Sequence, residues 1–344
     1  IIMIAKPGKP QTDPKSYRPI SLLSTISKLF EKLFARRLRR VVEESGIVPD
    51  HQFGFRGKHS TVEQVHRLTS VVREALENKQ FCPTAFLDVS QAFDKVWTLG
   101  LLHKLSHYLP QQYVEILASY LYRRKFKIHY GEAMSETKMI TAGVPQGSVL
   151  GPLLYTLFTA DIPTHPDIVT AMFADDTALV AVGSSYEEAN SRLQGHMDTV
   201  YSWTRDWKIK LNSEKSVQVD FALRPLKSLP LCIDGVQINV NDSAKYLGVH
   251  LDKKLNWKKH VMAKKEELKL KLQSMYWMMR PKSKISLDNK RLLYTTILRP
   301  IWAYAAQIWA CTADTNILMI QRVQNKILRT ISGAPWYMTN HQIH

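Results

Sequence analysis

The 344-residue chain is 45% hydrophobic and 10% aromatic, which is enough apolar material for two or three subdomains, each with its own core. Its 47 Lys and Arg residues outnumber 30 Asp and Glu residues. The resulting charge of +17 and the sequence pI near 9.7 favour a polyanionic partner, with nucleic acid as the first candidate. The spacing of Cys82, Cys232 and Cys311 indicates neither a disulfide framework nor a Cys-based zinc site.

The sequence shows no secretion signal and no transmembrane segment. No apolar run approaches the roughly 20 residues that a membrane-spanning helix needs. The apolar start at residues 1–4 is too short for a signal peptide. We therefore expect an intracellular protein, in the nucleus, the cytoplasm or both. Because the chain lacks an initiator Met, we also expect it to be a fragment of a longer protein.

The first eighty residues alternate loop and helix. A basic, proline-marked stretch over residues 6–19 predicts a loop. Apolar residues with a 3.6-residue period over 22–41 predict a helix that ends near Gly46. A capping-box pattern at residues 60–63 starts a second helix. The ARRLRR segment, residues 35–40, is a nuclear-localisation signal or a solvated or RNA-facing helix surface, and we favour the surface.

The rest of the chain predicts a mixed α/β unit followed by helices. The PTAFLD run predicts a buried strand that enters a helical pattern after Asp88. Residues 126–143 predict a hairpin, and a helix opens after the PQG segment at 145–147. AMFADDTALV, residues 171–180, predicts two apolar strands joined at the Asp-Asp turn. Beyond about residue 256 the pattern is helical, basic and rich in Met and Trp.

Charge is distributed unevenly along the sequence. Residues 251–300 hold 14 Lys and Arg against 4 Asp and Glu, a net charge of +10. Residues 139–180 hold no Lys or Arg, yet they contain the adjacent Asp175 and Asp176. No sequence-local cation neutralises this pair. A bound metal ion or solvent must therefore compensate for its charge.

Two-metal phosphoryl transfer requires carboxylates from different parts of a chain to converge on two divalent ions. Asp88 at a strand end and Asp175–Asp176 at a hairpin turn are candidates, because adjacent central strands would bring them together. The residues alone leave another interpretation open. Asp88 can cap the helix expected after it, and the Asp pair can be a solvated turn.

Seven segments occur in a characteristic order: YRPISLL, QFGFRGKHST, FLDVSQAFDKV, AGVPQGSVLGPLLY, FADD, NSEKS and YLGVHLD. Together they closely resemble the reverse transcriptases of non-LTR (LINE-type) retrotransposons, with insect jockey-like elements as the nearest comparison. The resemblance implies an α/β (α+β) right-hand polymerase. It implies fingers over 1–80, truncated on their N-terminal side, and a palm with the catalytic motifs over 81–222. It also implies a primer-grip hairpin and a basic helical thumb or C-terminal region over 223–344.

The resemblance carries catalytic roles to matching residues. Asp88 matches the first catalytic aspartate, and Asp175 and Asp176 match the catalytic pair. With the backbone carbonyl of Val89, these residues are expected to hold two Mg²⁺ ions, for which Mn²⁺ can substitute. Phe93, five residues after Asp88, matches the aromatic gate under the incoming sugar, where a ring would clash with a ribose 2′-OH. A core aromatic is the alternative interpretation of Phe93.

An incoming nucleotide brings a triphosphate, whose charge requires cations. Lys6 and Arg18 resemble the fingers residues that close over it, although Lys6 can also be a solvated loop lysine. Gln146 resembles a nucleotide-contacting residue, and Gly147 allows close approach of the backbone. Lys215 resembles the lysine that protonates or neutralises the pyrophosphate leaving group, with an ordinary strand-edge lysine as its alternative.

Template and primer need a basic groove that contains aromatic residues. The resemblance assigns a template-contacting fingers segment to Phe53, Gly54, Phe55, Arg56 and Lys58. It assigns the primer-grip turn to Tyr246, Leu247 and Gly248. The basic residues of 251–300 would face backbone phosphates from the thumb. Met275, Trp277, Met278 and Met279 are either part of the thumb core or a platform on which bases stack, and we favour the core.

The leading hypothesis is an RNA-directed DNA polymerase that extends a primer 3′-OH with dNTPs on an RNA template. The alternative is a catalytically inactive nucleic-acid-binding remnant of a mobile element, which the intact carboxylates and the glycines of AGVPQGSVLGP disfavour. A two-metal nuclease would explain the aspartates but not the PQG segment or the basic thumb. The expected partners are an RNA template, a DNA primer or target and dNTPs, without a membrane. The sequence leaves the oligomeric state open.

Overall fold

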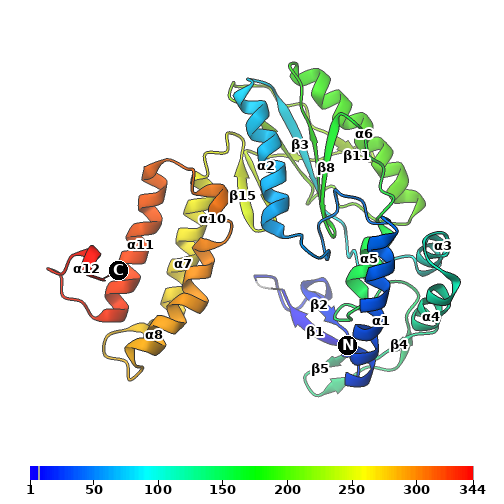
Figure 1. Ribbon diagram of the computed structural model, residues 1–344, viewed down its shortest axis with the longest axis horizontal. Helices are drawn as coiled ribbons and strands as arrows, with labels where there is room; N and C mark the ends of the chain where they lie inside the picture. Colours follow the sequence, from blue (N-terminus) through cyan, green and yellow to red (C-terminus); the bar gives the residue numbers. More distant parts are fainter. Residues whose placement is uncertain (7, 344) are drawn as a thin grey trace.

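A five-stranded sheet lies at the centre of the computed structural model, which describes residues 1–6 and 8–343 (Figure 1). Its strands follow the order β13–β10–β3–β9–β8. Their bounds are Asn239–Val240 for β13, Val217–Phe221 for β10, Cys82–Leu87 for β3, Asp176–Ala181 for β9 and Ile168–Phe173 for β8. The central strand β3 runs antiparallel to both β9 and β10. This order places β3 beside a hairpin that lies far along the sequence.

Helices cover both faces of this sheet (Figure 1). Helix α2 (Thr61–Glu77), which opens with the capping box expected at residues 60–63, packs on the face that includes Phe86. Helix α6 (Tyr186–Asp206) packs on the face that includes Ala85 and Leu87. The alternation follows from the two-residue period of a strand. Because all six residues of β3 are buried, Asp88 leaves the end of a rigid strand.

The proline-marked stretch near the N-terminus forms part of a second sheet. Strands β1 (Ile2–Ala5) and β2 (Tyr17–Ile20) pair antiparallel, and the 3₁₀ turn Pro14–Ser16 precedes β2. Strand β5 (His129–Tyr130) pairs with β1 and with β6 (Ala133–Met134). The short strands β4 (Lys125–Phe126) and β7 (Lys138–Met139) also pair. The hairpin expected at 126–143 therefore forms, and it ties β1 to the middle of the chain.

Helix α1 (Thr25–Glu44) forms where it was predicted, but only part of its apolar stripe is buried. Phe34, Leu38 and Val42 pack against a cluster that includes α3 (Thr98–Tyr108), α4 (Gln111–Leu121) and α5 (Gly151–Phe158). The exposed residues of its apolar stripe are Leu22, Ile26, Leu29, Phe30 and Leu33. The stripe is wide, and only one of its edges meets the neighbouring helices. Periodicity therefore predicted the helix but not which side of the stripe is covered.

The helix expected directly after Asp88 does not form. Val89 forms a β-bridge with Leu211, residues 90–95 make consecutive turns, and α3 begins only at Thr98. Backbone hydrogen bonds hold these turns: the Gly143 N–H donates to the Val96 carbonyl at 2.7 Å, and the Val144 N–H donates to the Phe93 carbonyl at 2.8 Å. Pairing with a distant backbone segment has overridden the local helical pattern.

Two short hairpins precede the helical C-terminal part. They are β11 (Cys232–Ile233) with β12 (Val236–Gln237), and β14 (Ser243–Tyr246) with β15 (Val249–Asp252). The helices that follow are α7 (Lys258–Met279), α8 (Leu287–Leu293), a π-helical turn (Tyr294–Leu298), α9 (Arg299–Ala303), α10 (Ala306–Trp309), α11 (Asp314–Ser332) and α12 (Asn340–Ile343). The expected helical character beyond residue 256 is confirmed.

The helical part has two cores. At its base, Val261 and Ile320 join the core that covers the sheet, whereas Met275, Met279 and Ile327 form a separate outer core. The expectation that Trp277 belongs to the core was wrong, because its side chain is 67% exposed. Across residues 1–6 and 8–343, no helix is long and apolar enough to cross a membrane.

Candidate active site

Three carboxylates meet where the end of β3 adjoins the β8–β9 hairpin. Leu87, the last residue of β3, pairs with Thr177 of β9, so Asp88 and Asp176 occupy the next positions of the ladder. Asp175 lies in the turn that joins β8 to β9. The structure thus brings Asp88 together with the Asp pair, as the strand pattern predicted.

The hairpin turn consists of Ala174 and Asp175, one residue earlier than the Asp-Asp turn expected, since Phe173 pairs with Asp176. Ala174 has φ of +58°, a left-handed conformation that is strained for a residue with a Cβ. Gln52 holds this turn: its Oε1 accepts hydrogen bonds from the Ala174 N–H at 2.9 Å and the Gly54 N–H at 2.7 Å. A buried amide side chain therefore fixes the strained turn that presents Asp175.

Burial and mutual repulsion act on the carboxylate pair. Removal from water raises the pKa of Asp175, and the Asp88 charge raises it further, against a hydrogen bond from the backbone of Asp175 itself. Asp176 keeps a solvent-exposed edge, yet burial, followed by the charges of Asp175 and Asp88, raises its pKa to about 6. In both side chains, burial and the neighbouring carboxylates disfavour the charged form.

One cation and one buried hydroxyl approach Asp88. The Nζ of Lys215 lies 3.7 Å from Oδ2 of Asp88, and the Lys215 side chain is largely solvent-exposed. The Asp88 N–H donates to the Ser216 hydroxyl at 3.1 Å. Although the Asp88 side chain as a whole is 41% exposed, its Oδ2 atom is buried and has no hydrogen-bond partner among the described residues. The carboxylate thus holds an acceptor that protein donors leave unused.

These observations fit a divalent cation. Asp175 and Asp176, whose pKa values are raised by burial and by neighbouring carboxylates, lie beside a buried oxygen of Asp88 that has no hydrogen-bond donor among the described residues; this set suits the oxygen-rich coordination of Mg²⁺. Across residues 1–6 and 8–343, no three acidic, His or Cys side chains already stand in a metal-holding arrangement. The carboxylates would therefore have to draw closer around an ion.

The carbonyl of Val89 is the backbone candidate for the same cation. The Asn212 N–H donates to the Asp88 carbonyl at 2.8 Å, and the Ser90 N–H donates to the Lys210 carbonyl at 2.9 Å. Backbone groups alternate between the two sides of an extended strand. The Val89 carbonyl therefore faces the opposite side, toward the β8–β9 hairpin that carries Asp176.

Phe93 lies in a row of aromatic rings beside the carboxylates. Its ring stacks on the buried ring of Tyr155 with centroids 4.9 Å apart, and Phe55 contacts it edge-on at 6.3 Å. Burial, followed by the charges of Asp175 and Asp176, raises the pKa of Tyr155, so this ring lies beside the carboxylate pair. The half-buried Phe93 is held by this stack rather than by a closed core.

Gln146 has a partner that the sequence did not indicate. Its Nε2 donates to Oδ2 of Asp94 at 2.9 Å, and its carbonyl accepts from the Ser21 N–H at 2.8 Å. Burial raises the pKa of Asp94, while the hydrogen bond from Gln146 and the charge of Lys6 lower it. A Cβ on Gly143 would lie 2.6 Å from the Asp94 carbonyl oxygen, so glycine is required for this close packing.

The two cations predicted to contact a triphosphate lie at adjoining β-strands. Lys6 follows β1, and its Nζ donates to the Lys15 carbonyl at 2.8 Å. Arg18 pairs with Ile4 across β1 and β2, and its side chain is exposed without an ion pair in the described part of the chain. Gly147 has φ of +98° and packs against the Ser21 carbonyl, which follows β2. The PQG segment is thus docked on the strand that carries Arg18.

The predicted template segment is joined to the catalytic hairpin. Gly54 is buried, and a Cβ there would lie 2.2 Å from the Ala174 nitrogen, so Gly54 serves close backbone packing. Arg56 donates to the carbonyls of Pro49 at 2.9 Å and Gln52 at 3.3 Å. In this segment the exposed side chains are Phe55 and Lys58, while Phe53 is half-buried against His59.

The predicted primer-grip turn packs against β8 and against Tyr304. Tyr246 is buried, and its hydroxyl donates to the Ala171 carbonyl of β8 at 3.1 Å. The Tyr304 hydroxyl donates to the Leu247 carbonyl at 2.7 Å, and its ring would lie 3.2 Å from a Cβ on Gly248. The structure thus assigns Tyr246 to the core and leaves Leu247 and Gly248 half-exposed at the turn.

Sequence reasoning missed Gln52, Asp94 and Tyr304. Each acts through a partner at least 52 residues away along the chain. Asp94 stands in the FDKV part of a motif that was singled out, so its position was a usable signal. Gln52 is likewise the first residue of the QFGFRGKHST segment, whereas Tyr304 stands in no quoted segment and in no pattern of charge or period that could have identified it.

Comparison with known proteins decides the family. Residues 4–251 match the family model described as "Reverse transcriptase (RNA-dependent DNA polymerase)". The chain belongs to this reverse transcriptase family. It is 43% identical over its full length to the "Probable RNA-directed DNA polymerase from transposon X-element" of Drosophila melanogaster and covers 38% of that protein. It is 40% identical over its full length to the "RNA-directed DNA polymerase from mobile element jockey" of Drosophila melanogaster, again covering 38%.

The chain therefore spans about two fifths of the length of the curated relatives it matches. Its relatives identify it as a reverse transcriptase of the jockey-like, non-LTR type. Among solved structures, a telomerase from Candida tropicalis in complex with an RNA fragment matches with a TM-score of 0.47 at 12% identity. That match covers 93% of this chain and 56% of the telomerase chain, and at this score it supports no further step.

Proposed function

We propose that this chain is the polymerase part of a jockey-like non-LTR retrotransposon protein and extends a primer 3′-OH with dNTPs on an RNA template. The observation that carries the proposal is the ladder position that sets Asp88 beside Asp176, with Asp175 in the adjoining turn. Family membership and the relatives' names support the reaction type. In this proposal residues 1–80 are the fingers, 81–222 the palm and 223–344 the primer grip and thumb.

The chemistry requires divalent cations, which the family uses. Asp88, Asp175, Asp176 and the Val89 carbonyl would hold two Mg²⁺ ions, which supply charge neutralisation at the attacking and leaving oxygens. The chain's own residues do the remaining work in this proposal. Gln52 keeps the turn in position, and Phe93 lies where a ring can exclude a ribose 2′-OH.

The cations around the site suit the triphosphate. Lys6 is close enough to Asp94 to lower its pKa, which locates it near Gln146. Arg18 carries a free guanidinium on the strand against which Gly147 packs. Lys215, 3.7 Å from Asp88, is close enough to the carboxylates to serve the pyrophosphate leaving group. We assign Lys6, Arg18, Gln146 and Lys215 to the nucleotide on these grounds.

The assigned contacts to template and primer differ between segments. Phe55 and Lys58 are exposed and can contact a template strand directly, whereas Phe53, Gly54 and Arg56 position the segment. Leu247 and Gly248 stand at the primer-grip turn, with Tyr246 supporting them from the core. The basic residues of 251–300 provide the charge for duplex phosphates.

A primer-extension assay tests this function. The purified chain is incubated with oligo(dT) annealed to poly(rA), Mg²⁺ and either dTTP or UTP. We expect elongation with dTTP and little with UTP. The function is contradicted if the protein binds the primer–template but no dTTP is added at any Mg²⁺ or Mn²⁺ concentration. Degradation of the strands without elongation would instead indicate a nuclease.

A further inference from the structure

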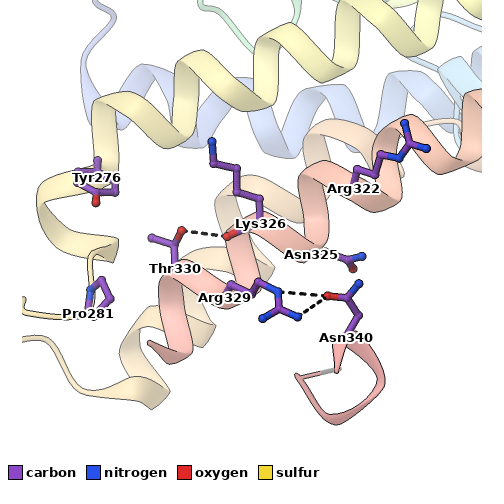
Figure 2. A pocket seen from close by; sticks show the side chains of 8 residues that line it. All are labelled: Tyr276, Pro281, Arg322, Asn325, Lys326, Arg329, Thr330 and Asn340. Atoms are coloured by element: carbon purple, nitrogen blue, oxygen red, sulfur yellow. Dashed lines mark hydrogen bonds between the residues drawn. The ribbon is translucent and has the colours of Figure 1, made fainter. Parts of the chain in front are cut away.

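A solvent-open cavity is lined by residues of α11 and α12. In Figure 1, α12 and the end of α11 next to it lie at the outer end of the helical part, away from the central sheet. The cavity has a volume of about 510 Å³ and lies between the end of α7, the second half of α11 and the start of α12 (Figure 2). Helix α11 reaches from the core of the sheet, through Ile320, to the outer core, through Ile327 and Ile331. The cavity lies along the outer half, so it is separate from the three carboxylates.

The charge around this cavity is of one sign. Arg322, Lys326 and Arg329 line it at helical spacings of four and three residues, so they share one face of α11. No Asp or Glu occurs in residues 268–287 or 315–344, the segments that border the cavity. Arg322 and Lys326 are exposed and form no ion pair within residues 1–6 and 8–343. Two uncompensated cations therefore face solvent here.

Arg329, unlike Arg322 and Lys326, hydrogen-bonds to the segment that follows α11. Its guanidinium donates to the Met338 carbonyl at 2.6 Å and to the Pro335 carbonyl at 3.3 Å. It also donates to Oδ1 of Asn340 at 3.0 Å (Figure 2). Gly333, with φ of +64°, ends α11 and turns the chain back toward the cavity. A single arginine thus fixes the segment 333–340 beside the cationic face.

That segment displays two aromatic rings to solvent. Trp336 is 89% exposed and Tyr337 is 71% exposed, with ring centroids 6.0 Å apart. Tyr276, which lines the cavity from the end of α7, is also exposed. Exposed rings of this size are uncommon without a partner. Trp336 and Tyr337 belong to the segment that Arg329 binds, and Arg329 lines the cavity together with Arg322 and Lys326.

We propose that this surface, Arg322 and Lys326 with Trp336 and Tyr337, is a second binding site for single-stranded nucleic acid. Cations that follow a backbone and rings on which bases stack are the combination that binds single strands with little sequence preference. An acidic peptide would use the cations but not the rings. The site is distinct from the catalytic carboxylates, and it holds a strand whether or not the chain polymerises DNA.

The test measures binding of fluorescently labelled 20-nucleotide oligo(rU) and oligo(dT) to the full chain by anisotropy, across a salt series. An excess of unlabelled blunt RNA–DNA duplex occupies duplex-binding surfaces. The two variants are Trp336→Ala with Tyr337→Ala, and Arg322→Ala with Lys326→Ala. All four side chains are exposed, so both variants should keep the wild-type melting temperature. The matched controls are Tyr122→Ala, and Arg224→Ala with Lys227→Ala, which are also exposed.

We expect each double variant to bind about tenfold more weakly than wild type, with both controls unchanged. Loss of two phosphate contacts should also reduce the slope of log affinity against log salt by about 1.4. A loss for oligo(rU) alone identifies RNA as the ligand, and a loss for both identifies single strands in general. Wild-type affinity and salt slope in both variants would overturn the proposal. The proposal would also be overturned if the aromatic variant bound with wild-type affinity and poly-Glu displaced the labelled strand from wild type as well as unlabelled oligonucleotide does. That result would mean that the surface binds anions of any kind.

Discussion

The side-chain amide of Gln146 donates a 2.9 Å hydrogen bond to the carboxylate of Asp94. This bond connects the PQG segment to the residue after Phe93. Gln146 has rotatable bonds that burial alone does not fix, so the Asp94 carboxylate orients the amide that we assign to the nucleotide. The lysine that follows β1 lies near the same carboxylate. Asp94 is thus a positioning residue.

Asp94→Ala should raise the KM for dNTP about tenfold, with a smaller change in kcat, because a hydrogen bond to a charged group contributes about 1.5–3 kcal/mol. Asp94→Asn, which retains an acceptor oxygen, should show an intermediate KM. Steady-state primer extension measures both. The matched control is Asp198→Ala, which removes a similar bond from Gln194 on the exposed face of α6. Unchanged KM in Asp94→Ala would show that Gln146 needs no partner.

Phe93→Val should increase incorporation of UTP relative to dTTP by roughly tenfold or more, since space for one small group changes discrimination by about that factor. The stack on Tyr155 holds the ring, and removing it opens room beside the carboxylates. Competition between the two nucleotides in primer extension gives the ratio. Phe30→Val serves as control, because Phe30 also stacks on another ring but lies exposed on α1. If sugar selectivity stays the same, Phe93 is a packing residue and not the gate.

Mg²⁺ affinity should depend on pH through Asp176. Its pKa is raised from 3.8 to about 6, so the folded, metal-free protein holds an extra proton between these values. The contribution of that proton to the stability of the folded state is fully present below about pH 4 and is lost as pH rises through about 6. The metal binds the deprotonated form, so apparent Mg²⁺ affinity should be about tenfold weaker at pH 5 than at pH 7.

Thermal unfolding with increasing Mg²⁺ measures this dependence. In Asp176→Asn, the metal-free protein should melt higher than wild type above pH 6, because the repulsion from Asp175 and Asp88 is removed. The same variant should lose most of the stabilisation by Mg²⁺. A wild-type Mg²⁺ response that is equal at pH 5 and pH 7 would rule out Asp176 as a ligand that titrates near 6.

Gln52→Ala should lower the free energy of unfolding by about 2–4 kcal/mol, because it leaves the N–H groups of Ala174 and Gly54 buried without an acceptor. Urea unfolding at constant Mg²⁺ measures the change. Gln111→Ala removes an exposed side-chain bond on α4 and should stay within about 0.5 kcal/mol of wild type. If Gln52→Ala lowers the free energy of unfolding as little as Gln111→Ala does, the turn does not depend on the Gln52 side chain.

The sequence predicted the centre of the site better than its surroundings. The proximity of Asp88 to the Asp pair could be predicted, because strand ends and hairpin turns have local sequence patterns. When two such patterns belong to adjacent strands, they lie at the same end of the sheet. The clamp by Gln52 could not be predicted, because a polar side chain that bonds a backbone 122 residues away leaves no periodic signal.

Helix α1 and the residues after Asp88 show a second limit of prediction from local sequence patterns. The period over 22–41 gave the helix, but exposed Ile26 and buried Leu38 belong to the same apolar stripe, and only packing distinguishes them. The residues after Asp88 have a helical pattern, yet residues 90–95 form turns, and backbone bonds join Phe93 and Val96 to Val144 and Gly143. In both cases long-range contacts decide what the local pattern leaves open.

The central claim is that Asp88, Asp175 and Asp176 together carry out DNA synthesis on RNA. The most direct measurement is single-turnover addition of one dTTP to oligo(dT) on poly(rA), compared between wild type and Asp176→Asn, with primer–template affinity measured on the same preparations. We predict that the rate falls by about a thousandfold or more, equivalent to roughly 4 kcal/mol, while affinity changes less than about threefold. A variant that adds dTTP at the wild-type rate would contradict the account.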